Sequence, residues 1–368
     1  MKPYSLCFIF SDVNSSKTLE YLVLQASKEY RCKVYIFGSE DNLLKKRLQE
    51  SNIDVHLMIN HGTRFSFFIF CLRLMYIALK EKCLFFTSGL LATYALLVLK
   101  ILRFKFPWIF IRHHSDAHLG KPIFRKLDKL SASKANRVIS VSKIVSRLLV
   151  SEGLDPTKVE MVHNGIILPK IKPSFSGISL RSSFRVGLVS RVEPLKGLEF
   201  VLEALIKISN QISFEIWHVG EIGGSSERYR ELIQHESINS RYKHFPWQED
   251  LSWFYSSIDC FIHAPITDTA ESFGMVYLEG LASDALCIFT KSGILNEISH
   301  SNEGFWVEVP HRDSSSIASA ILSVSGSHSY RGNTHKRHLL LEGFSLKKTI
   351  DSYQRLIRSE IQKSMNSS

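Results

Sequence analysis

Two glutamates flank a glycine in the segment ESFGMVYLE, which spans residues 271–279. This pattern predicts a loop that becomes a helix at Gly274, with Glu271 before the helix and Glu279 on its second turn. The free N–H groups at the start of that helix would belong to Gly274, Met275 and Val276. The positive end of a helix dipole binds phosphate or diphosphate, and a glycine lets the anion approach the backbone. An isolated pair of glutamates at this spacing is more often an ordinary helix with an acidic residue before it.

A second loop supplies positive charge. The segment VGLVSRVEPLKG, residues 186–197, places Arg191 and Lys196 between a predicted strand and a predicted helix. Loops that follow parallel strands meet at the same edge of the sheet, so both cations are expected near the helix that starts at Gly274. A departing diphosphate gains negative charge as its bond breaks, and two cations beside a helix N-terminus would stabilise it. Either cation alone would more often be a solvated loop charge.

Short apolar runs alternate with amphipathic stretches along the chain, which predicts parallel sheets with helices on both faces. In the first half, strands are expected at 4–10, 33–37, 53–58, 84–86, 108–111 and 137–141, with helices at 17–29, 42–50, 65–80, 90–102, 122–133 and 143–152. In the second half, strands are expected at 185–190, 213–219, 260–263 and 286–289, with helices at 195–208, 228–236, 275–282, 315–324 and 345–362, and an exposed loop at 323–338.

A linker with two prolines, at 167–177, separates the two halves. The predicted fold class is therefore α/β, with two Rossmann-like doubly wound parallel-sheet domains facing a central cleft. The expected domains are 1–172 and 173–344, and the helix at 345–362 is expected to pack back near the hinge. Ligands of such folds bind at the carboxyl ends of the strands.

The motifs taken together resemble those of the retaining family 4 glycosyltransferases (glycosyl transferases group 1), which have the GT-B fold. The resemblance covers about residues 108–298, and its motifs are IRHHSDAH, VISVSKIVSRLLVSEGL, VEMVHNGI, VGLVSRVEPLKGLEFVLEAL, WHVGE, ESFGMVYLEGLA and SGILNEI. It implies an acceptor-binding N-terminal domain and a donor-binding C-terminal domain. The expected activity is transfer of a sugar from a nucleotide-sugar, with UDP as the expected nucleotide, to a lipid-linked or glycan acceptor. The expected pathway is surface polysaccharide or lipopolysaccharide biosynthesis.

The resemblance also implies roles for single residues at the donor site. Arg191 and Lys196 match the pair that holds the donor diphosphate, and Glu279 matches the acidic residue that binds the ribose hydroxyls. Glu271 matches the glutamate that faces the transferred sugar. Phe273 and Gly274 shape the same loop, which continues into Met275 and Val276.

Four further residues match less specific positions of the family pattern. Gly220 matches a glycine at a strand end near the nucleotide, and Trp247 lies either near the base or in ordinary packing. In IRHHSDAH, either His113 or His114 matches the histidine that reaches the cleft from the acceptor domain, and the doubled histidine leaves both open. A lone histidine would more often be a core residue, whereas a pair at a strand end makes the catalytic interpretation about equally good.

The sequence departs from the family pattern in three places. Residues 11–16 (SDVNSS) replace a Gly-Gly loop, and residues 292–297 (SGILNE) replace the usual Gly-Gly before Pro-Glu. Ala264-Pro265 replaces Pro-Ser and is followed by a short insertion, 266–270. These changes bear on donor specificity more than on the class of reaction.

No metal or cofactor is expected. The sequence contains no Asp-x-Asp triplet, which glycosyltransferases of the other common fold use to hold a divalent metal on the diphosphate. The six cysteines form neither a CxxC pair nor a metal-binding spacing with histidine, so they are interpreted as reduced core cysteines of a cytoplasmic protein.

The charge of the chain is uneven. Residues 1–175 hold 27 Lys and Arg against 13 Asp and Glu, a net charge of +14, whereas the whole chain carries +11. Such a half fits an anionic partner, either nucleic acid or an acidic membrane surface, although an ordinary solvated surface fits about as well. The apolar runs at 65–79 and 90–99 are interrupted or too short to span a bilayer, and the N-terminus is interpreted as a core strand, not a signal peptide. We therefore expect a peripheral protein at the inner face of the plasma membrane.

Two other classes of protein fit part of the pattern. A sugar-nucleotide epimerase shares this fold, but the sequence offers no recognisable set of catalytic carboxylate and histidine residues for that reaction. A basic nucleic-acid-binding protein would fit the charge, but the chain has no basic motif interleaved with aromatic residues and no helix-turn-helix signature. Nucleic acid is therefore not an expected partner.

Overall fold

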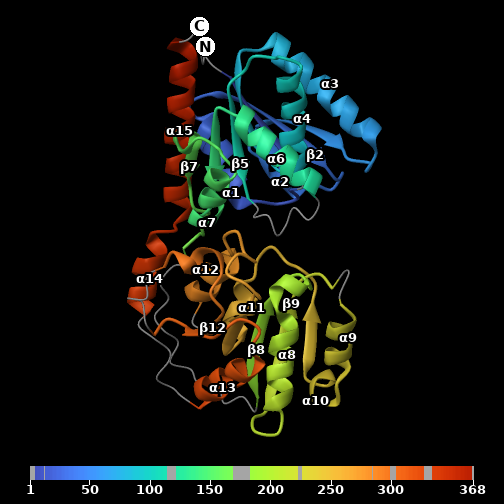
Figure 1. Cartoon of the computed structure of the whole chain (residues 1–368), viewed down its shortest axis with the longest axis vertical. Helices are drawn as coiled ribbons and strands as arrows, with labels where there is room; N and C mark the ends of the chain where they lie inside the picture. The colour runs from blue at the N-terminus through green and yellow to red at the C-terminus, as the bar shows by residue number, and fades with distance from the viewer. Residues whose placement is uncertain are drawn as a thin grey trace. The chain divides into compact units, whose positions relative to one another are not determined.

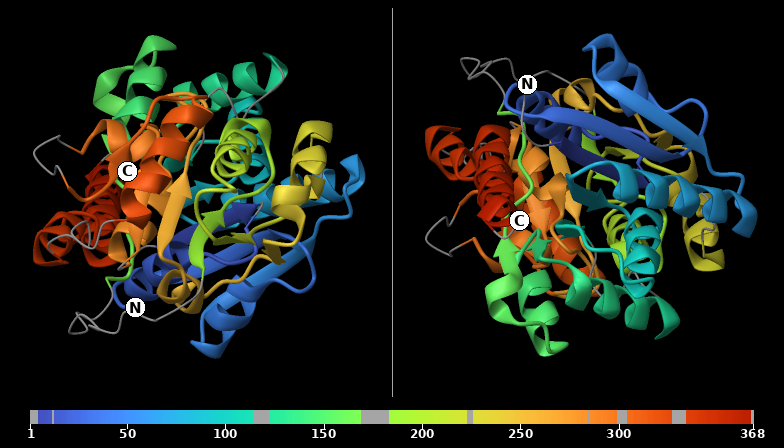
Figure 2. Two further views of the ribbon diagram at one scale, coloured as in Figure 1. Left: turned by 90° about the horizontal axis from the view of Figure 1, so that it is seen from below. Right: turned by 90° about the horizontal axis from the view of Figure 1, so that it is seen from above.

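The computed structural model describes residues 5–11, 13–113, 122–168, 183–222, 226–283, 285–298, 304–326 and 334–366. The chain divides into two compact units, one of Met1–Gly165 with Leu346–Ser368 and the other of Ile166–Ser345. Helices cover both faces of the sheet in each unit (Figure 2).

The first unit (Figure 1) is built on a parallel sheet whose seven strands have the order β3-β2-β1-β4-β5-β6-β7. Its strands are β1 (Ser5–Ser11), β2 (Arg31–Gly38), β3 (Asp54–Ile59), β4 (Cys83–Ser88), β5 (Trp108–Arg112), β6 (Arg137–Ser140) and β7 (Val159–Met161). Its helices are α1 (Lys17–Ser27), α2 (Leu43–Glu50), α3 (Arg64–Lys80), α4 (Leu90–Ile101), α6 (Pro122–Lys134), α7 (Lys143–Ser151) and α15 (Leu346–Asn366).

Central strands of this sheet are apolar along their whole length because helices bury both of their faces. In β1 every residue after Ser5 is buried, and Phe8 lies between Val34 of β2 and Phe86 of β4. The last helix, α15, packs against α1, and its buried Tyr353 contacts the ring of Phe86. Residues from both ends of the chain therefore share one core.

The second unit is built on a six-stranded parallel sheet in the order β10-β9-β8-β11-β12-β13. Its strands are β8 (Phe184–Val189), β9 (Phe214–Val219), β10 (Tyr242–Phe245), β11 (Cys260–His263), β12 (Leu286–Phe289) and β13 (Val307–Glu308). Its helices are α8 (Leu198–Lys207), α9 (Glu227–Gln234), α10 (Glu236–Asn239), α11 (Ser252–Ser257), α12 (Met275–Ala282), α13 (Ser314–Ser325) and α14 (Thr334–Glu342).

The two doubly wound parallel sheets confirm the predicted fold class. Short elements escaped the sequence patterns: β10 has only four residues, of which two are exposed, and β13 has two. The helix expected at 228–236 ends at Gln234, because His235 takes an extended backbone (ψ 138°) and a separate short helix follows. The predicted bounds of the loop at 323–338 were wrong at both ends, because α13 runs to Ser325 and α14 begins at Thr334.

All six cysteines lie in the described part of the chain, and each is buried and outside any disulfide. Among the residues that the structure describes, no helix is long and apolar enough to cross a membrane.

Candidate active site

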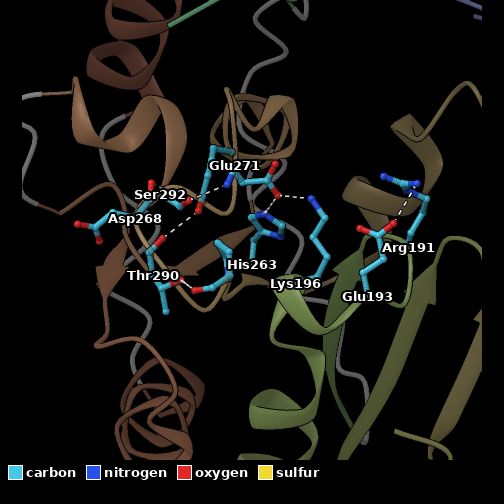
Figure 3. Close-up of polar contacts among 10 residues, drawn as sticks. Arg191, Glu193, Lys196, His263, Asp268, Glu271, Thr290 and Ser292 are labelled. Atoms are coloured by element: carbon cyan, nitrogen blue, oxygen red, sulfur yellow. Dashed lines mark hydrogen bonds and ion pairs between the residues drawn. The ribbon is translucent and has the colours of Figure 1, made fainter. Parts of the chain in front are cut away.

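The side chains of Lys196 and His263, from separate segments of the second unit, meet at the carboxylate of Glu271 (Figure 3). Lys196 Nζ donates a hydrogen bond to Glu271 Oε1 over 2.6 Å, and His263 Nε2 donates to the same oxygen over 2.9 Å. The side chains of Lys196 and Glu271 are only 12% and 11% exposed, so this ion pair is largely shielded from water. A charge pair in such an environment is held more strongly than one at the surface.

The pair forms because two loops at the carboxyl edge of the sheet approach closely. Lys196 ends a single 3₁₀ turn after β8, and Gly197 follows in the left-handed conformation (φ 67°). A Cβ atom on Gly197 would lie 1.9 Å from the carbonyl oxygen of Ala264, which comes directly after β11. Only glycine therefore allows the Lys196 loop to lie against the chain that leads to Glu271.

The loop before α12 is anchored by side chains of the segment that follows β12. Ser292 Oγ accepts a hydrogen bond from the backbone N–H of Glu271 at 3.0 Å and donates one to the carbonyl of Asp268 at 3.0 Å. Thr290 Oγ1 donates to the carbonyl of Pro265 at 2.7 Å. Ser292 lies in the segment where the sequence departs from the Gly-Gly pattern, and here its hydroxyl positions the backbone of Glu271.

The charge state of Glu271 follows from its neighbours. Burial raises the pKa of Glu271, but the hydrogen bond and charge of His263 and the charge of Lys196 outweigh it and lower that pKa to about 2. The carboxylate is therefore ionised at neutral pH. An ionised carboxylate accepts hydrogen bonds and cannot donate a proton.

A cavity of about 180 Å³ lies beside this cluster. It is lined by Val189, Ser190, Arg191, Lys196, His263, Glu271, Gly274, Met275 and Val276. Gly274 is the N-cap of α12 and has no side chain to bond the first N–H groups of the helix. The cavity thus combines a buried cation, a helix N-terminus and a carboxylate, which are the groups expected for a phosphorylated sugar.

Arg191 lies at the edge of this cavity, and its side chain is 58% exposed and forms an ion pair with Glu193 at 3.0 Å. The loop that carries Arg191 is held by the buried His218. Nε2 of His218 donates to the carbonyl of Ser190 at 2.9 Å, while Nδ1 lies within hydrogen-bond distance of the hydroxyls of two tyrosines, Tyr229 and Tyr242. Burial lowers the pKa of His218 to about 4, so this imidazole is neutral near pH 7.

The remaining donor-site predictions fall outside the residues that line the cavity. Glu279 lies one helical turn after Met275 on α12, and its Oε2 accepts a hydrogen bond from Tyr255 at 3.1 Å. Phe273 is buried with its ring against Phe344, so it supports the loop and does not face the cavity. The other two positions are Gly220, directly after β9, and Trp247, which is 53% exposed in the chain after β10.

In the first unit, His113 follows β5, and its Nε2 lies 2.9 Å from Ser88 Oγ at the end of β4. His114 lies outside the described residues. His113 therefore stands at the carboxyl edge of its sheet, where the sequence placed the pair.

Sequence patterns missed His263, which both contacts Glu271 and lines the cavity. It ends the four-residue strand CFIH, in which every residue is buried, so it looks like an ordinary core position. The one available signal is its place at the carboxyl end of a central parallel strand.

Within the described ranges, no group of three histidine, cysteine, aspartate or glutamate residues is placed to hold a metal ion. The expectation that no metal takes part remains a prediction.

Solved structures share this two-unit fold. The crystal structure of HepE from Anabaena in complex with UDP and glucose matches with a TM-score of 0.76 at 19% identity, covering 96% of this chain and 99% of that one. A glycosyltransferase from Rickettsia africae matches with a TM-score of 0.74 at 19% identity, over 97% and 98% of the two chains. WaaB, a lipopolysaccharide outer core galactosyltransferase, matches at 0.69 and 14% identity, over 97% and 99%. The fold is therefore that of the GT-B glycosyltransferases.

Family models identify the chain more closely. The model described as Glycosyltransferase Family 4 matches residues 21–168, and the one described as Glycosyl transferases group 1 matches residues 180–337. No curated protein matches the sequence. The chain belongs to the group 1, family 4 glycosyltransferases, and it is a glycosyltransferase; the resemblance stated from its motifs is confirmed.

Proposed function

We propose that the protein transfers a sugar from a UDP-sugar to a lipid-linked or glycan acceptor with retention of anomeric configuration. The observation that carries the proposal is the cavity that joins Lys196, Glu271 and the start of α12. HepE, whose structures contain UDP, UDP and glucose, or UDP-glucose, supports the choice of nucleotide.

The groups in the cavity, and Glu279 outside its lining, each have a proposed task. The donor diphosphate binds at the first N–H groups of α12, with Lys196 and Arg191 beside it. When the bond between the sugar and the diphosphate breaks, its electron pair leaves with the phosphate oxygen, and these cations stabilise the added charge. Glu271 accepts hydrogen bonds from hydroxyls of the sugar, because it is ionised and held by His263. Glu279 binds the ribose.

The acceptor and its location form the second part of the proposal. The N-terminal unit binds the acceptor, with either His113 or His114 facing it, and the enzyme works at an anionic membrane surface in surface polysaccharide or lipopolysaccharide assembly. WaaB supports this pathway by likeness alone. The net charge of +14 on residues 1–175 supports the anionic surface.

A ligand screen tests the donor assignment. UDP and UDP-sugars are expected to raise the melting temperature of the protein, because a ligand that binds only the folded state stabilises it; about 2.7 kcal/mol is gained at a hundred times Kd. GDP- and ADP-sugars serve as matched comparisons in the same thermal-shift experiment. Stabilisation by a GDP- or ADP-sugar without any by UDP would refute the assignment of the nucleotide.

A chelation experiment tests the proposal that the cations and the helix N-terminus replace a metal. Turnover in excess EDTA is expected to equal turnover with added Mg²⁺, because the diphosphate charge is already neutralised by protein groups. Loss of most activity on chelation, restored by Mg²⁺, would show that the phosphate site is assigned wrongly.

A further inference from the structure

Helix α3 is apolar on two opposite sides, although it lies at the surface of the N-terminal unit (Figure 1). Its inner side packs through Ser66, Phe70, Cys71, Leu74 and Ile77. Its outer side carries six large apolar residues that are between 41% and 71% exposed: Phe65, Phe68, Ile69, Leu72, Tyr76 and Leu79. We call these six residues the outer stripe. An amphipathic surface helix would have polar residues there.

The outer stripe is continuous. Phe68 and Ile69 are adjacent and the other members follow at intervals of three or four residues; at 3.6 residues per turn this spacing places them along one side of the helix, opposite the packed side. They extend from the second residue of the 17-residue helix α3 to the second-last. Scattered exposed apolar residues are normal on a protein surface, whereas a contiguous apolar patch marks an interaction site.

The neighbouring helix α4 is exposed at one end only. Most of α4 is buried, including Leu96, Leu97 and Leu99, but Val98, Ile101 and Leu102 at its C-terminal end are exposed. The two helices pack side by side. Of the two apolar segments noted in the sequence, therefore, α4 is mainly a core helix and α3 presents the surface.

The residues around the patch are mainly basic, which indicates an anionic partner. Residues 64–105 contain seven basic residues and one acidic residue, Glu81. The carboxylate of Glu81 forms an ion pair with Lys33. Three of the basic residues, Arg64, Arg73 and Lys80, are exposed on α3 itself. A helix with an apolar stripe, basic flanks and no acidic residue of its own fits the interface of an anionic bilayer, where apolar side chains enter the acyl boundary and cations meet the headgroups.

We propose that α3 is the membrane-docking element, with its outer stripe inserted in the plane of an anionic lipid surface. The proposal deepens the proposed function, since it places the acceptor domain on the bilayer and makes the acceptor a lipid-borne glycan. The docking itself does not depend on the donor, so it can be tested without turnover.

The test uses the full chain and a matched pair of triple variants. The stripe variant is Phe68→Ser with Leu72→Ser and Tyr76→Ser, and the control variant is Tyr21→Ser with Val150→Ser and Met365→Ser. The control residues are also exposed, at 40% to 52%, but lie on α1, α7 and α15. Co-sedimentation is measured with phosphatidylcholine vesicles, with and without phosphatidylglycerol.

The wild type and the control variant are expected to bind the anionic vesicles, and the stripe variant to bind about tenfold or more weakly. Arg73→Glu with Lys80→Glu should weaken binding mainly at low salt, because the Debye length falls from about 10 Å at 0.1 M to about 3 Å at 1 M. The UDP-induced thermal shift of the stripe variant should equal that of the wild type, which separates docking from donor binding and reports folding.

Three results would overturn the proposal. The wild type could fail to bind anionic vesicles, or the stripe variant could bind as well as the wild type. Alternatively, light scattering could show that the wild type is a dimer which the stripe substitutions convert to a monomer, in which case a second copy covers the stripe. Vesicle binding as expected, together with no UDP-induced shift, would remove the proposed donor and leave the docking surface in place.

Discussion

Replacing Lys196 is expected to lower kcat several hundredfold while changing KM for the donor far less. Lys196 is the less exposed of the two cations that line the cavity, and in the proposed reaction its attraction to the diphosphate strengthens as the leaving group gains charge. Loss of one such charged group in a water-poor site costs about 3–4 kcal/mol of transition-state stabilisation. Steady-state kinetics of Lys196→Ala and of the longer Lys196→Met measure the effect.

Two further variants complete this experiment. Lys207→Ala is the matched control, because Lys207 lies at the far end of α8, outside the cavity lining, and its Nζ bonds the surface hydroxyls of Ser314 and Ser315. Arg191→Ala should also act on kcat, since Arg191 lines the cavity. If Lys196→Ala and Arg191→Ala both keep near-normal kcat, the two residues are loop charges without a role at the diphosphate, and the site assignment is wrong.

Replacing Glu271 is expected to abolish most turnover and leave affinity for free UDP nearly unchanged, because Glu271 faces the sugar in the proposed complex. Glu271→Gln keeps the shape of the side chain and removes its charge, whereas Glu271→Ala also leaves the buried Lys196 without its partner. Breaking a buried pair in this way costs about 3–5 kcal/mol of folding free energy. Calorimetry with UDP and kinetics at a temperature well below the melting transition distinguish the loss of chemistry from the loss of stability.

The stability of Glu271→Gln should also depend on pH in a defined way. The pKa of Glu271 is lowered from 4.5 to about 2 by folding, so its contribution is fully present above pH 4.5 and is lost as pH falls toward 2. The difference in unfolding free energy between wild type and Glu271→Gln should therefore shrink over that window. Urea unfolding at a series of pH values measures it, and a constant difference would show that the carboxylate is not held by His263 and Lys196. Tyr255→Phe, which removes a hydrogen bond to Glu279, should leave this pH dependence intact.

Periodicity alone was enough to predict two doubly wound domains, because burial on both faces makes parallel strands apolar throughout and their covering helices amphipathic. The helix after Gly274 was also predicted correctly, since a glycine followed by an apolar run is a local signal. β10 and β13 were not predicted, because edge strands of four and two residues carry too few side chains to show a period.

What the sequence by itself determined is the chemistry available at one edge of the second sheet: two cations, a glycine before a helix and two glutamates. Only the tertiary structure decided which of them meet. Lys196 and Glu271 are 75 residues apart, and they bond because Gly197 lets one loop lie against the carbonyl of Ala264. The same contact brings in His263, whose strand has the sequence of an ordinary buried core segment, whereas Glu279 bonds Tyr255 outside the lining of the cavity. The physical reason is that a local pattern specifies an element and its faces, while the partners of a side chain depend on backbone approaches between segments that are distant in the chain.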